Sequence, residues 1–98
     1  MSLKTQCDFD LLVNIMEDIV ISEVDKQLKL SENMKICRCQ ECILDICAIA
    51  LNQLKPMYGS LNSFKGAMYK DHITQESEDD VDKAVKKAMY KVISHPPH

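Results

Sequence analysis

The chain has very little glycine and proline: its 98 residues include two glycines and three prolines. An all-β domain needs such residues for its repeated tight turns, so their scarcity argues against one. The hydrophobic content of 46% is ordinary for a globular protein, which excludes wholesale disorder. We therefore predict a single all-α domain over residues 1–98, built from three to four helices.

Long hydrophobic runs and excess positive charge are also missing. The longest apolar run, Ile46 to Leu51, is far shorter than the roughly 18 residues of a membrane span. The net charge of −3 argues against direct nucleic-acid binding, which requires a basic surface. No basic and then apolar leader opens the chain, so we expect no secretory signal and a cytoplasmic location. In that reducing compartment the five cysteines are not expected to form structural disulfides.

Two helices are predicted in the first half of the chain. The first runs from about Phe9 to Leu28, capped by Asp8 or Asp10, because its apolar residues recur at helical spacing. Its apolar face is broad enough to accept a partner. The second runs from Cys39 or Gln40 to Leu54. It is apolar almost all the way round, which predicts burial on most sides, within the domain or across a dimer interface.

The second half of the chain contains one clear helix, over about residues 76–93. Its regular apolar stripe comprises Val81, Ala84, Val85, Ala88, Met89 and Val92, with lysines on the opposite face. Before it, the residues around Gly59 are expected to form a turn and loop. Segment 60–76 is not fixed by the sequence: within it, Phe64 to Ile73 fits a short helix and an extended segment equally.

Three cysteines stand at the start of the second predicted helix, as Cys37-Arg-Cys39-Gln-Glu-Cys42. Thiolates this close in sequence can converge on one point if the chain turns there. The partial positive charge of a helix N-terminus favours the thiolate form. Structural zinc takes four ligands and prefers thiolate sulfur. We therefore predict that Cys37, Cys39 and Cys42 bind zinc.

The fourth ligand stays open. Cys47 follows Cys42 by five residues, which turns it about 140° away on a helix. Cys7 lies before the first helix, at its far end from the cluster, although in an antiparallel dimer it could approach the partner's cluster. The remaining candidates are His72, His95, His98, Glu41 and water.

Other interpretations of the cysteines compete with zinc. They could be small buried residues, but Arg38, Gln40 and Glu41 between them make a poor core segment. The Cys39-Gln-Glu-Cys42 spacing also permits thiol-redox chemistry, although no βαβ pattern surrounds it. Enzymatic activity is not expected: paired carboxylates such as Glu17-Asp18 are typical of a solvated surface, and no glycine-rich phosphate loop is present.

The cysteine run and the residues after it resemble one family. The stretch ends with Asp45, Ala48, Ala50-Leu51-Asn52, Leu54, Pro56 and Tyr58 at characteristic offsets. In this combination it is similar to the late competence development protein ComFB family, with the match extending over about residues 14–58. Lys55 departs from the family pattern, where a proline is usual, and Cys47 replaces a small residue.

The resemblance implies a small helical homodimer with cysteine-bound zinc, acting as a regulatory or interaction module whose role in competence is undefined. It also implies an alternative, because some relatives are receptors for cyclic dinucleotides such as cyclic di-AMP or cyclic di-GMP. Such a ligand needs a basic cleft, for which Lys35, Arg38 and Lys55 are the local candidates.

Three motif residues have expected supporting roles. Asp45 lies three residues after Cys42, on the same helix face, and could accept from the backbone or from Arg38 near the metal. Asn52 can satisfy free carbonyls at the helix end. Tyr58 can pack its ring beneath the second helix.

Overall fold

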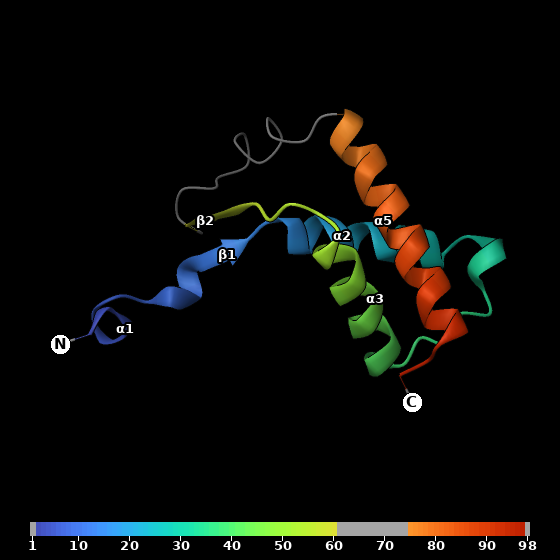
Figure 1. Cartoon of the computed structure of the whole chain (residues 1–98), viewed down its shortest axis with the longest axis horizontal. Helices are drawn as coiled ribbons and strands as arrows, with labels where there is room; N and C mark the ends of the chain where they lie inside the picture. The colour runs from blue at the N-terminus through green and yellow to red at the C-terminus, as the bar shows by residue number, and fades with distance from the viewer. Residues whose placement is uncertain (1, 61–74, 98) are drawn as a thin grey trace.

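A computed structural model describes residues 2–60 and 75–97, and it is mostly helical (Figure 1). In chain order the elements are α1 (Leu3–Gln6), the 3-10 turn η1 (Phe9–Leu11), β1 (Leu12–Asn14), α2 (Met16–Leu28), the 3-10 turn η2 (Ser31–Asn33), α3 (Gln40–Asn52), β2 (Tyr58–Ser60) and α5 (Gln75–Ser94). The expected helical domain is confirmed, but the all-α prediction is wrong, since β1 and β2 form a small sheet. The expectation for Phe64 to Ile73 lies outside the described residues.

The first long helix, α2, begins at Met16 rather than Phe9. Asn14 explains the later start: its Oδ1 accepts from the backbone N–H of Met16 at 3.2 Å, which satisfies a free donor at the helix end. The predicted capping residue Asp8 caps η1 instead, accepting from the N–H of Asp10 at 3.0 Å. The apolar spacing from Leu12 onward is therefore helical only from Met16.

A short sheet ties the start of α2 to the segment after α3. β1 and β2 are antiparallel, with Leu12 opposite Ser60 and Asn14 opposite Tyr58. Asn14 Oδ1 also accepts from the N–H of Met57 at 2.7 Å. The turn and loop expected around Gly59 is thus wrong for residues 58–60, because this pairing across more than 40 residues of sequence leaves no local pattern.

The core is formed where α2, α3 and α5 pack together. α3 ends at Asn52, close to the expected limit. On it Cys42, Ile46 and Ala50 recur every four residues and are each fully buried. The expectation that α3 is buried on most sides is not met within one chain, because Leu44 is 58% exposed. One apolar face of α3 is therefore left at the surface.

The C-terminal helix α5 confirms its prediction. All six residues of the expected apolar stripe are buried, and α5 runs antiparallel to α3, which it contacts most extensively (Figure 1). Gln27 ties α2 to α5. Gln27 is 2% exposed, and its amide donates to Glu23 Oε2 at 2.9 Å and to Asp82 Oδ1 at 2.6 Å. A buried amide without such partners would destabilise the fold.

Within the described ranges, no helix combines the length and the apolar character that crossing a bilayer requires.

Candidate metal centre

The three cysteines converge at the N-terminal end of α3. Their Sγ atoms all lie within 4.8 Å of one another. Cys39 is the N-cap of α3, and its Sγ accepts from the backbone N–H of Cys42 at 3.4 Å. Cys42 is fully buried in the first turn, whereas Cys37 and Cys39 are exposed. The group therefore has one face against the core and one open to solvent.

The loop before α3 is held in place by Arg38, which stands between two of the cysteines. Its Nη2 donates to the carbonyl of Leu28, at the end of α2, at 2.7 Å, and more weakly to the carbonyl of Asn33 at 3.4 Å. Asn33 in turn donates from Nδ2 to the carbonyl of Gln27 at 2.7 Å. These contacts satisfy carbonyls that a helix C-terminus leaves free. They fix the turn that brings the thiols together beside the end of α2.

Without a metal, the buried thiol resists ionisation. Burial, reinforced by hydrogen bonds and charge interactions with the thiols of Cys39 and Cys37, raises the pKa of Cys42 to about 12 from its ordinary 9.0. Three thiols cannot all be deprotonated next to one another unless a cation compensates the charge. The arrangement therefore suits a bound cation better than a set of free thiolates.

Zinc fits this donor set. In tetrahedral coordination with Zn–S bonds near 2.3 Å, sulfur atoms lie about 3.8 Å apart. Sulfur atoms within 4.8 Å reach that spacing through small side-chain rotations. The partial positive charge at the start of α3 also favours thiolates. The three cysteines could thus provide three of the four ligands that a structural zinc site takes.

Comparison with protein families agrees with the geometry. The profile of the late competence development protein ComFB matches residues 13–96. The chain belongs to the ComFB family. The match is longer than the resemblance over residues 14–58 indicated, and it includes α5 as well as the cysteine group. Comparison with curated proteins gave no match. Membership in the ComFB family supports a competence-associated protein.

The candidates for the fourth ligand are distributed over the ComFB domain. Cys7 is exposed just after α1, in the N-terminal arm that extends away from the three-helix core (Figure 1). Cys47 lies on the groove between α2 and α3, and burial raises its pKa. Glu41 and His95 are exposed, while His72 and His98 lie outside the described residues. None of the four described candidates belongs to the group of converging thiols.

Of the three supporting residues, only Tyr58 lies in a position that conflicts with its expected role. Asp45 is half-buried on α3, but the hydrogen bonds described for Arg38 go to backbone carbonyls and to Met34 rather than to Asp45. Asn52 is the last residue of α3 and is exposed. Tyr58 lies in β2 with 61% of its surface exposed, so its ring is not packed beneath α3.

Sequence reasoning missed two polar residues that hold the helices around the site together. Asn14 falls on the polar face of the predicted first helix, although asparagine just before an apolar helical run is a common cap. Gln27 is not among the residues that the sequence singles out, yet it is buried and organises contacts to α5 and to the loop before the cysteines. A glutamine inside a helical pattern carries no local signal of such a role.

Proposed function

We propose that this ComFB protein is a non-catalytic, zinc-stabilised helical module that acts in the cytoplasm as a homodimer and regulates or bridges partner proteins. The observation that carries the proposal is the convergence of Cys37, Cys39 and Cys42 at the start of α3. A metal held there stabilises the fold, because the bound ion links the loop, the helix start and the end of α2.

Zinc accounts for the cysteines better than thiol-redox chemistry does. A thiol-redox centre uses a pair of cysteines, whereas three thiols converge here and one of them, Cys42, is fully buried. Three thiolates beside one another suit a bound cation, which compensates their charge. Among the residues that the structure describes, the exposed carboxylates Glu17, Asp18 and Asp80 lie outside the group of converging thiols.

The zinc proposal is tested by counting metal and reactive thiols together. In protein purified without chelator, zinc should be near one per chain. A thiol reagent should modify the exposed Cys7 rapidly, and Cys37 and Cys39, which are also exposed, only after chelation. Cys39→Ser should lose the metal, whereas Cys7→Ser should retain it. A Cys39–Cys42 disulfide in the purified protein, with no metal, would instead support a redox role.

The proposed dimer uses the apolar face left open by α2 and α3. A groove of about 630 Å³ lies between these helices, lined mainly by Ile21, Val24, Ile43, Leu44, Cys47 and Leu51. Ile21 and Leu44 are 53% and 58% exposed. A contiguous exposed apolar surface of this kind marks an interaction site. Because Glu17 and Asp25 line the groove together with Arg38, a two-fold partner can place opposite charges across it.

The dimer interface is tested by placing a charge on it. Ile21→Glu should yield a monomer in sedimentation or native mass spectrometry, because a carboxylate would be buried without a partner. Ser22→Glu introduces the same charge at the next position, which is exposed but does not line the groove, and should stay dimeric. The same oligomeric state in both variants would show that the interface lies elsewhere.

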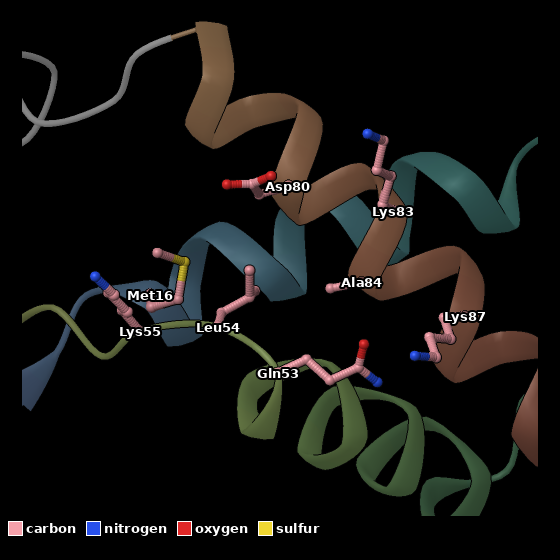
Figure 2. A pocket seen from close by; sticks show the side chains of 8 residues that line it. All are labelled: Met16, Gln53, Leu54, Lys55, Asp80, Lys83, Ala84 and Lys87. Atoms are coloured by element: carbon pink, nitrogen blue, oxygen red, sulfur yellow. The ribbon is translucent and has the colours of Figure 1, made fainter.

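A second candidate function, cyclic-dinucleotide binding, is favoured by a basic cleft where α5 meets the end of α3. Figure 2 shows Lys55 beside Met16 at one end of the cleft, and Gln53 and Lys87 facing each other at the other. The cleft also contains Lys83 and one carboxylate, and its volume is about 630 Å³.

The composition of this cleft suits a ligand with separated negative charges. None of its three lysines takes part in an ion pair with any residue that the structure describes. Apolar side chains, including Leu54 and Ala84, lie between the basic groups and suit the bases or sugars of a nucleotide. The basic residues expected from sequence were Lys35, Arg38 and Lys55, of which only Lys55 lines this cleft.

Calorimetry with cyclic di-AMP and cyclic di-GMP tests this candidate. Lys87→Glu should weaken binding at least tenfold, whereas Lys91→Glu, one turn further along α5 and outside the cleft, should change it little. If neither nucleotide gives a heat of binding at concentrations up to the millimolar range, the receptor function is excluded.

A further inference from the structure

The C-terminal end of α5 lies at the same end of the molecule as the cysteine group. α5 runs antiparallel to α3, so its last turn reaches the level at which α3 begins (Figure 1). Cys42, in the first turn of α3, and Val92, in the last turn of α5, are both buried in the core that the helices share. A ligand placed just beyond Val92 would therefore lie at the same end of that core as the thiol group.

His95 occupies that position. Its backbone N–H donates to the carbonyl of Lys91 at 2.9 Å, so the helical hydrogen-bond pattern continues to this residue. His95 follows Ala88 by seven residues, which places the two within about 20° of each other around the axis. Ala88 is fully buried in the core shared with α2 and α3. His95 thus extends the buried face of α5 by one turn, to where α3 and its cysteines begin.

We propose that His95 is the fourth ligand, so that the site is a Cys₃His centre that clasps the end of α5 to the start of α3. The inference rests on the proposed zinc site. In this structure the His95 imidazole lies outside the group of converging thiols. His95 is exposed, as are Cys37 and Cys39, so its imidazole can turn toward the thiols without leaving a packed position. Cys₃His is an established ligand set for structural zinc.

The chemistry and placement of the other candidates are less suitable. Cys7 lies in the arm at the opposite side of the molecule, and Cys47 faces the α2/α3 groove (Figure 1). Glu41 offers a carboxylate, which zinc accepts less readily than imidazole beside three thiolates. After His95 the two consecutive prolines, Pro96 and Pro97, restrict the backbone. They limit the conformational entropy that the tail loses when its histidine binds.

Cobalt(II) substitution tests the ligand set directly. The d–d bands of tetrahedral cobalt respond to the replacement of nitrogen by another donor, and the sulfur-to-cobalt charge-transfer intensity counts thiolates. His95→Ala should shift the d–d bands, leave a three-thiolate charge-transfer intensity and weaken zinc binding by at least about 100-fold, since loss of mere outer-shell partners already costs 10–100-fold. His95→Cys should restore tight binding with the intensity of four thiolates.

Matched variants decide the assignment. His98→Ala and Cys7→Ser should leave the spectrum and the affinity unchanged. The proposal is overturned if His95→Ala binds cobalt and zinc as the unsubstituted protein does, or if Cys7→Ser lowers the charge-transfer intensity by a quarter. Failure of the unsubstituted protein to bind either metal is a different result, because it removes the zinc site itself and the fourth ligand with it.

Discussion

Replacing Cys42 with serine separates the contribution of metal from that of packing. Cys42 is fully buried, and its sulfur lies in both the hydrophobic core and the thiol group. In metal-free protein, Cys42→Ser should lower the free energy of unfolding by only about 1–3 kcal/mol, the cost of burying an imperfectly paired hydroxyl. With zinc the loss should be larger, because the variant no longer gains from metal binding.

The size of the zinc effect depends on mass action. At free zinc 1,000 times above its dissociation constant, a ligand specific for the folded state adds about 4 kcal/mol. For a domain of this length, 1 kcal/mol shifts the melting temperature by about 4–8 °C, so zinc should raise it by roughly 15–30 °C. Cys47→Ser is the control, because Cys47 lies outside the thiol group and should preserve the zinc-dependent rise.

Thermal unfolding followed by circular dichroism, in zinc-buffered and chelator-containing solutions, provides the assay. The unsubstituted protein and Cys47→Ser should show the large rise, and Cys42→Ser should show almost none. The reasoning is refuted if Cys42→Ser keeps the full rise, or if zinc leaves the melting temperature of the unsubstituted protein unchanged.

Three further predictions concern stability. Ile46→Ala, at a fully buried position, should cost about 2–5 kcal/mol in urea unfolding, whereas Ile93→Ala, 58% exposed on α5, should cost about 0.5 kcal/mol or less; equal costs would place the core elsewhere. Asn14→Ala should cost about 1–2 kcal/mol and Asn14→Asp much less, because a carboxylate oxygen can accept the same two N–H groups; similar losses for both would contradict this capping role. In metal-free protein the raised pKa of Cys42 means that the folded state holds this proton more tightly than the unfolded state does. The stability that this adds below pH 9.0 should therefore be lost as the pH rises toward about 12. The loss should be absent in Cys42→Ala, and a loss of equal size in that variant would exclude Cys42 as its source.

The sequence predicted those parts of the fold that depend on local periodicity. The stripe of α5 and the four-residue spacing of Cys42, Ile46 and Ala50 on α3 are strong helical signals, and both helices lie close to where they were expected. The predicted start of α2 was wrong because the residues before it form β1, which pairs with a strand more than 40 residues away. A three-residue strand has too few alternating positions to be seen in sequence.

For the candidate site, too, the sequence predicted what depends on local spacing and not what depends on packing. The close sequence spacing of the cysteines, together with the helix start, predicted their convergence, and the structure brings all three sulfurs within 4.8 Å. The role of Arg38 could not be predicted, because its partner carbonyl at Leu28 is positioned by the path of the whole loop. The nearness of the α5 end depends likewise on how the helices pack, which no local pattern encodes.

The central claim is that the protein is a zinc-stabilised dimer. Native mass spectrometry of protein purified without chelator, repeated after chelation, tests it most directly. One experiment then gives the identity of the metal, the number of ions per chain and the oligomeric state. We predict a dimer with one zinc per chain, and a loss of both ions accompanied by destabilisation after chelation. A metal-free monomer with five reduced cysteines would contradict the account.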